Sequence, residues 1–281
     1  MMAERHVLGL SGGKDSAALA VYMRQHYPNL QIDYFFTDTG KELPEVYDFL
    51  GRLEGFLGRP IHYLNPHRDF DFWLRTYGNF LPSPKTRWCT RQLKLEPFKR
   101  WIRPWLESGD KVFSYVAIRS DEEHREGMVT QHDNLIVKLP FREHGIDKAS
   151  VIEILEGSGL GLPKYYDWRS RSGCTFCFFQ QKIEWVRLKR NHPNEFEDAK
   201  DYEKTALKHG SPFTWSQGES LSELERPERI AEIEADFEAR KERELARRRP
   251  NPLRVATAEP LDIDDLYLED EGGGACLVCH K

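Results

Sequence analysis

A loop near the start of the chain has residue types that could bind phosphate. It reads Ser11-Gly12-Gly13-Lys14-Asp15-Ser16. Adjacent glycines allow a tight turn and bring backbone N–H groups close to an anion. A helix beginning there would add a partial positive charge, Lys14 adds a full one, and Ser16 can cap the helix or contact a phosphate oxygen. The spacing is neither that of the Walker loop nor that of the dinucleotide loop, so it predicts a different phosphate cradle.

A strand before this loop and a helix after it are needed to position it. Residues 7–10 form a short apolar run typical of a buried strand, and residues 17–23 are rich in Ala and Leu, which favour helix. Similar patterns predict further strands at residues 31–36, 61–64, 112–118 and 135–139, and helices from residue 44 and at 69–77, 146–155, 178–190 and 227–249. Alternating strands and helices predict an α/β fold, a parallel sheet with helices on both faces.

A second candidate loop, Thr37-Asp38-Thr39-Gly40, follows the strand expected at residues 31–36. Ligands of parallel sheets bind beyond the carboxyl ends of the strands, so both loops are expected to face one site. Asp38 could coordinate Mg²⁺ or hydrogen-bond a ribose. Taken alone, the segment is compatible with an ordinary turn, because Asp and Thr are common at such positions.

Three segments together resemble a known superfamily. Ser-Gly-Gly-x-Asp-Ser resembles the PP-loop of the N-type ATP pyrophosphatases, which cleave a nucleotide between its α and β phosphates. Residues 37–47 resemble the D-T-G-x-x-x-P-E-x-Y segment of phosphoadenylyl-sulfate (PAPS) reductases. Residues 117–125 resemble the Gly-x-Arg-x-x-[Glu/Gln]-Ser-x-x-Arg segment of that family, with Ala117 in place of Gly.

The resemblance implies a HUP-like (adenine nucleotide alpha hydrolase) fold that binds ATP and Mg²⁺. The catalytic residues that it implies are Lys14, Asp15, Asp38 and Arg119. The nucleotide-binding residues that it implies are Ser11, Gly12, Gly13, Lys14, Asp15, Ser16, Thr37, Asp38, Thr39, Gly40 and Arg119. Arg125 is a further phosphate candidate, whereas Glu122, Glu123 and His124 are expected in a solvated loop.

Cysteines form the second group of chemically capable residues. Residues 174–177 have the Cys-x-x-Cys spacing, which lets two thiolates bind one metal or cluster. The spacing alone leaves open zinc, iron–sulfur, a redox pair and buried free thiols. The segment around Cys89 resembles that of iron–sulfur adenylyl-sulfate reductases, with Thr90 in place of their second Cys. It resembles more closely the Cys-Thr-x-x-Leu-Lys form of the DNA phosphorothioation sulfur-transfer enzymes (DndC- and SspD-like proteins). The resemblance implies a [4Fe–4S] cluster on Cys89, Cys174 and Cys177, its fourth position open or held by Cys276 or Cys279.

Composition predicts three regions. Residues 1–182 are expected to form the nucleotide-binding domain, residues 183–250 a helical C-terminal region and residues 251–281 a flexible acidic tail ending in Cys-x-x-Cys-His. The tail cysteines loosely resemble the nucleophile of the sulfate-activating reductases. They are open to interpretation as sulfur carriers, as a metal pair or as incidental thiols.

The overall balance of residues is that of a cytoplasmic globular protein. Hydrophobic residues make up 39% and charged residues 31% of 281, and no apolar run is long enough for a membrane span or a secretory signal. The net charge of −5 does not indicate a general nucleic-acid binder, but residues 87–103 and 240–249 are basic. The segment Trp168-Arg169-Ser170-Arg171 is a candidate nucleic-acid contact or part of the ATP site.

The resemblance implies an ATP pyrophosphatase that adenylylates an oxygen of a nucleic acid, most closely the DNA backbone, for sulfur insertion. Such phosphorothioation systems serve defence against phage. The partners implied are a cysteine desulfurase as sulfur donor, DNA or tRNA as substrate and other proteins of a modification system. The alternatives are a thioredoxin-dependent PAPS or adenylyl-sulfate reductase, a tRNA thiolation enzyme, and a regulatory module that binds nucleotide without catalysis.

Overall fold

A computed structural model describes residues 2–65, 67–122, 125 and 132–247. Its centre is a five-stranded sheet with the order β3-β2-β1-β4-β5, in which every neighbouring pair is parallel. The strands are β1 (Glu4–Leu10), β2 (Ile32–Phe36), β3 (Ile61–Tyr63), β4 (Lys111–Tyr115) and β5 (Leu135–Lys138). The order of strands changes direction at β1, so the loops after β1 and β4 flank the crevice where α/β sheets bind ligands.

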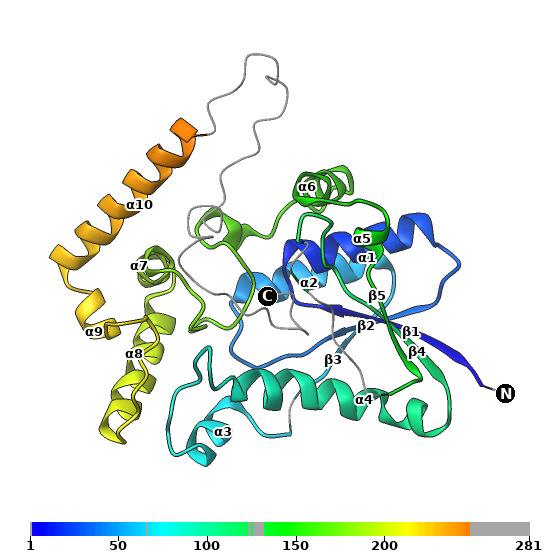
Figure 1. The fold of residues 1–281 in the computed structure, drawn as a ribbon, viewed down its shortest axis with the longest axis horizontal. Helices are drawn as coiled ribbons and strands as arrows, with labels where there is room; N and C mark the ends of the chain where they lie inside the picture. The colour runs from blue at the N-terminus through cyan, green and yellow to red at the C-terminus, as the bar shows by residue number, and fades with distance from the viewer. Residues whose placement is uncertain (1, 66, 123–124, 126–131, 248–281) are drawn as a thin grey trace.

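Helices cover both faces of the sheet (Figure 1). The helices are α1 (Lys14–His26), α2 (Pro44–Leu57), α3 (Phe70–Thr76), α4 (Glu96–Glu107), α5 (Pro140–Glu143), α6 (Lys148–Gly157), α7 (Lys182–Asn191), α8 (Pro193–Lys208), α9 (Leu221–Leu224) and α10 (Pro227–Arg247). A π-helix (Thr90–Leu95) leads into α4, and a 3₁₀ turn (Lys164–Asp167) follows α6. The α/β fold class predicted from the sequence is confirmed.

The second half of β1, residues 7–10, is apolar at successive positions because its side chains are buried on both faces of the sheet. Leu8 packs into the larger hydrophobic cluster with α1 and α2, whereas Val7 packs into a smaller cluster with Phe98 and Ile102 of α4. A strand buried on both faces needs apolar residues at successive positions rather than at every second one. Because β1 is held in the core in this way, the position of the loop that follows it is fixed.

Element ends differ slightly from expectation for local reasons. Helix α6 begins at Lys148 because Asp147 caps it, accepting a hydrogen bond from the Ser150 amide at 2.9 Å. Helix α7 begins at Lys182 because Gln181 and Glu184 form a capping box, so residues 178–181 lie outside the helix.

Helices α7 to α10 form the helical region expected after residue 182. Their apolar side chains, including Trp185, Phe196 and Phe237, belong to the same hydrophobic cluster as α1 and α2. The expected domain boundaries stay a prediction. The expected acidic tail, with Cys276 and Cys279, lies outside the described residues. Among the described helices, none combines the length and the apolar character that crossing a membrane requires.

Candidate functional site

The predicted phosphate loop connects β1 to α1. Gly12 has φ +72°, and a Cβ atom there would lie 2.5 Å from Cγ1 of Val46, so both backbone and space require glycine. Inside the loop, the Ser11 amide donates to Ser16 Oγ at 3.1 Å, and Ser16 Oγ donates to the Gly13 carbonyl at 3.2 Å. The loop therefore holds its own shape, with the first turn of α1 directly after it.

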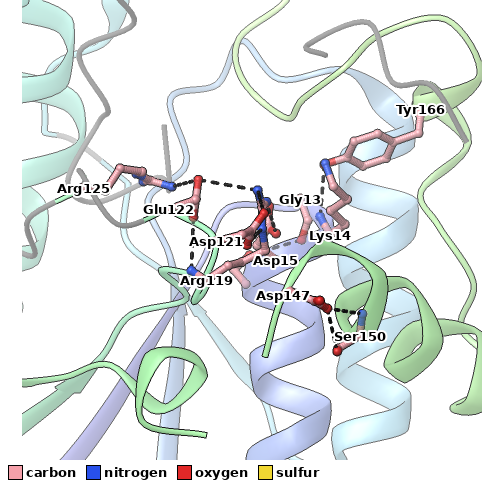
Figure 2. A network of polar contacts seen from close by, with 11 residues as sticks. Gly13, Lys14, Asp15, Arg119, Asp121, Glu122, Arg125, Asp147, Ser150 and Tyr166 are labelled. Atoms are coloured by element: carbon pink, nitrogen blue, oxygen red, sulfur yellow. Dashed lines mark hydrogen bonds and ion pairs between the residues drawn. The ribbon is translucent and has the colours of Figure 1, made fainter. Parts of the chain in front are cut away.

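Two neighbouring tyrosines that sequence reasoning missed contact this loop. Tyr165 is fully buried and donates to the Gly12 carbonyl at 2.7 Å. The Tyr166 hydroxyl accepts a hydrogen bond from the Lys14 amide at 3.1 Å, and the Lys14 ammonium lies 4.7 Å from the centre of the Tyr166 ring. Figure 2 shows Tyr166 reaching toward Lys14 at the start of α1. Its hydroxyl thus occupies one of the amides that a phosphate would use.

The second predicted loop is held by the carboxylate of Asp38. Asp38 Oδ1 accepts hydrogen bonds from the Gly40 amide and from the Tyr47 hydroxyl, both at 2.8 Å. Burial and the hydrogen bond to Asp38 raise the pKa of Tyr47, so Tyr47 keeps its proton and remains a donor. The Tyr47 contact fixes the orientation of the Asp38 carboxylate.

Arg119, which follows β4, lies beside the phosphate loop as predicted. Its guanidinium donates to Asp15 and to Asp121, each at 2.9 Å (Figure 2). Burial alone would lower the pKa of Arg119, but Asp15, Asp121 and Glu122 more than offset it and raise the pKa. The structure therefore brings Lys14, Asp15 and Arg119 together at the carboxyl edge of the sheet.

The expectation that Glu122 lies in a solvated loop is wrong. Glu122 is 7% exposed, accepts a hydrogen bond from the Arg119 amide at 3.1 Å and pairs with Arg125 at 2.6 Å. A carboxylate between two arginines is stabilised despite burial, which the sequence pattern alone did not reveal. Glu123 and His124 lie outside the described residues.

The Cys-x-x-Cys loop lies directly on the two nucleotide loops. Cys174 and Glu42 form an isolated antiparallel bridge, and the Thr175 amide donates to the Lys41 carbonyl at 2.7 Å. A Cβ atom on Gly13 would lie 2.8 Å from Ser172 Oγ, so the glycine permits this close approach. The segment after α6 thus joins the phosphate loop, the Asp38 loop and Cys174 into one packed unit.

The expected role of Trp168-Arg169-Ser170-Arg171 in nucleic-acid binding is corrected by burial. Trp168, Arg169 and Ser170 are at most 9% exposed. Arg169 donates to the carbonyls of Gly173 and Cys174, at 3.1 and 2.8 Å, and so shapes the cysteine loop. Of the four residues, only Arg171 is partly exposed.

The surroundings of Cys174 do not suit a cluster ligand as they stand. Its thiol lies 3.3 Å from Thr39 Oγ1 and donates to Glu42 at 3.7 Å. Burial and the Glu42 charge raise the pKa of Cys174, although Lys94 opposes them, and cluster ligands are thiolates. Among the described residues, no three or more His, Cys, Asp or Glu side chains are arranged to hold a metal ion. The predicted cluster therefore stays a prediction, and Cys276 and Cys279 lie outside the described range.

Magnesium places fewer demands on the protein. It is held by one or two carboxylates together with substrate phosphates and water, so three protein ligands are not needed. Asp38 uses only its Oδ1 in the contacts of the described residues, which leaves Oδ2 for such a role. This carboxylate fits the predicted ion.

The fold and the site define an α/β protein with a phosphate loop at the carboxyl edge of a parallel sheet. Residues 5–131 match the family model of the phosphoadenosine phosphosulfate reductase domain. The matched region contains both nucleotide loops, Cys89 and Arg119, and it ends before Cys174.

Two curated proteins and two solved structures are similar to this chain. Two uncharacterized proteins of Methanocaldococcus jannaschii are 28% and 24% identical over 68% and 66% of it. The alignments cover 40% and 44% of those proteins, so the chain spans less than half of their length.

The first structure is a phosphoadenylyl-sulfate (PAPS) reductase from Candida auris in a phosphate complex. It is 15% identical, with a TM-score of 0.48 over 60% of this chain and 81% of that chain. The second is the U34-tRNA thiolase NcsA from Methanococcus maripaludis with its [4Fe–4S] cluster. It is 17% identical, with a TM-score of 0.39 over 73% of this chain and 72% of that chain.

Proposed function

We propose that the protein is an ATP pyrophosphatase that activates an oxygen of a nucleic acid for replacement by sulfur. The observation that carries this proposal is the packing of the Cys174 loop against both nucleotide loops. The Thr175 amide donates to the Lys41 carbonyl at 2.7 Å, and Ser172 Oγ donates to Ser11 Oγ at 3.4 Å. A thiol chemistry and a phosphate chemistry would then share one site.

The phosphate chemistry follows from the charges at the sheet edge. The amides of the phosphate loop, the Lys14 ammonium and the Arg119 guanidinium would neutralise the triphosphate as charge builds on the leaving pyrophosphate. The planar guanidinium of Arg119 suits two phosphate oxygens at once. Asp15 and Asp121 hold that guanidinium in place. Asp38 would hold Mg²⁺, which supplies charge neutralisation when it is bound with ATP.

The reaction has two balanced steps. An acceptor oxygen bonds to the α-phosphorus of ATP while the bond to the β-phosphate oxygen breaks, and pyrophosphate leaves. Hydrosulfide then bonds to the activated atom of the acceptor, AMP leaves with the original oxygen, and the sulfhydryl proton passes to water. A cysteine desulfurase would provide this sulfur as a persulfide, which a second thiol reduces to hydrosulfide as a disulfide forms. The DNA backbone is our first acceptor, as in phosphorothioation, and tRNA is the alternative.

A reductase is the second candidate, favoured by the family model that matches residues 5–131. In that reaction the nucleotide itself carries the sulfur. A cysteine thiolate bonds to the sulfur, the nucleotide leaves, and the resulting thiosulfonate is reduced by a second thiol to release sulfite.

The products of two incubations separate these functions. The purified full chain is incubated with ATP and Mg²⁺, where water takes the place of the acceptor oxygen, bonds to the α-phosphorus and releases AMP and pyrophosphate. A separate incubation contains PAPS or adenylyl sulfate and reduced thioredoxin. We expect AMP and pyrophosphate from ATP and no sulfite from the sulfated nucleotides. Sulfite release without ATP cleavage would replace the proposal with the reductase. ADP and phosphate as products would show that the cleaved bond has been assigned wrongly.

A further inference from the structure

The segment between α3 and α4 concentrates positive charge in an acidic protein. Residues 77–95 contain two lysines, two arginines and no aspartate or glutamate, whereas the whole chain has a net charge of −5. In Figure 1 this segment lies between α3 and the start of α4. A local charge of this kind attracts polyanions even when the whole protein is acidic.

Two aromatic side chains of this segment are exposed, and the ring of one of them, Tyr77, is held in place. Tyr77 is 37% exposed and Phe80 is 41% exposed. The Tyr77 ring stacks on Trp88, with centroids 5.3 Å apart and planes at 12°, and Gln92 donates to its hydroxyl at 3.1 Å. The Trp88 indole donates to the Phe80 carbonyl at 3.2 Å. A ring fixed in the way that Tyr77 is loses little entropy when a nucleic-acid base stacks on it.

Further basic side chains lie between this segment and the cysteine loop. Lys85 and Arg91 are exposed, and within the described ranges neither has an ion-pair partner. The guanidiniums of Arg87 and Arg171 both lie over the ring of Phe179, at 5.2 and 5.1 Å from its centre. Phe179 follows Cys177 by two residues, so these contacts connect the exposed segment to the candidate site.

We name this surface the basic strip: Tyr77, Phe80, Lys85, Arg87, Arg91 and Arg171. Arg75 is excluded from it, because Arg75 lines a cavity together with Asp198 and Asp201. Nε of Arg171 is buried and has no hydrogen-bond partner within the described part of the chain. A buried cationic donor in this position leaves hydrogen-bonding capacity that an anion could use.

We propose that the basic strip binds an unpaired segment of the acceptor nucleic acid and leads it to the nucleotide site. This inference rests on the proposed function for the class of acceptor. Bases stack on Tyr77 and Phe80, and the arginines and Lys85 contact backbone phosphates. An exposed base needs an unpaired strand, because in a duplex its faces are covered by neighbouring bases.

Fluorescence anisotropy with labelled oligothymidylate and oligouridylate of about 12 nucleotides, a typical site size, tests the strip. The full chain is compared with Arg91→Gln and Tyr77→Ala. Matched controls are Lys111→Gln and Tyr27→Ala, which change exposed residues at the start of β4 and the end of α1, at the opposite edge of the sheet.

Arg91→Gln is expected to weaken the binding of both oligonucleotides. It should also reduce the slope of log affinity against log salt concentration by about 1. Tyr77→Ala is expected to weaken binding about tenfold, and the controls are expected to bind like the parent protein. Thermal melting checks folding. Phe80→Ala, which should also weaken binding, replaces Tyr77→Ala if that variant does not fold.

Unchanged binding in Arg91→Gln and Tyr77→Ala, or an equal loss in the controls, would overturn the strip. Failure of the parent protein to bind either oligonucleotide would also overturn the strip. Pyrophosphate release from ATP without nucleic acid is measured in parallel. Absence of pyrophosphate release from the parent protein would count against the proposed function, whereas the oligonucleotide data alone decide whether the strip binds nucleic acid.

Discussion

At the scale of single residues, the two loop glycines show why the phosphate loop was predictable. Gly12 needs a positive φ and lies against Val46, and Gly13 lies against Ser172. The turn is specified by the amino-acid types of the loop itself, so the loop could be recognised from six consecutive residues. The residues that press on it come from α2 and from a segment about 150 positions later, and no local pattern announces them.

Replacement of Gly12 by alanine is expected to destabilise the protein. The added methyl group is strained at φ +72° and would meet Val46, so the free energy of unfolding should fall by about 2 kcal/mol. The matched control is Gly51→Ala in α2, where no atom lies within 4 Å of the new Cβ. That change should raise the free energy of unfolding by about 0.5–1 kcal/mol. Urea denaturation measures both, and equal effects would contradict the described loop geometry.

Removal of the Tyr166 hydroxyl is expected to tighten nucleotide binding. The hydroxyl takes the Lys14 amide, so Tyr166→Phe leaves that donor for a phosphate oxygen. The control Tyr165→Phe removes a buried hydrogen bond to Gly12 and should instead lower stability by about 1 kcal/mol. Calorimetric titration with ATP provides the dissociation constants. Weaker binding in Tyr166→Phe would mean that the hydroxyl contributes to the nucleotide complex.

At the scale of elements, the ends of helices such as α6 were predictable from the sequence, whereas the pairing of distant segments was not. The helix expected at residues 146–155 begins at Lys148, directly after its cap Asp147, so its position was predicted to within two residues. The bridge between Glu42 and Cys174 joins residues 132 positions apart, and Arg169 turns inward to bond two carbonyls of the cysteine loop. The cap depends on neighbouring residues, whereas the inward turn of Arg169 depends on the folded chain, so Arg169 was misinterpreted as a surface contact.

The helical region should lose stability in acid through Glu219. This carboxylate pairs with Arg229 of α10 and Lys182 of α7, and the hydrogen bond from Arg229 is the main cause that lowers its pKa from 4.5 to about 2. A lowered pKa means that the stabilisation is present above pH 4.5 and is lost as the pH falls toward 2. Since the pair is partly exposed, we expect about 1 kcal/mol.

Thermal melting of the parent protein and Glu219→Gln over this pH range measures the loss. The difference in unfolding free energy between them should be largest near pH 6 and should shrink toward pH 2. Glu232→Gln, at an exposed partner of the same arginine, is the control and should show a smaller difference. A difference that does not vary with pH would contradict the assigned ion pair.

At the scale of the whole molecule, the sequence was sufficient for the fold class and for one edge of the site. Apolar runs such as residues 7–10 alternate with helical patterns, and that alternation requires a parallel sheet whose carboxyl edge gathers the loops. The placement of Lys14, Asp38 and Arg119 follows from it. The contribution of α7 to α10 to the same hydrophobic cluster does not, because no repeat or motif indicates which face those helices cover.

We propose that the sheet edge around Lys14 and Asp38 cleaves ATP between its α and β phosphates. The most direct measurement is the rate of pyrophosphate release by the full chain, by Lys14→Ala and by Asp38→Ala, with Lys111→Ala as a control at the opposite edge. We expect both site variants to fold and to lose at least about a hundredfold in rate, because each removes a group that neutralises or positions the phosphates. The control should keep the parent rate. Full pyrophosphate release by either site variant would contradict the assignment.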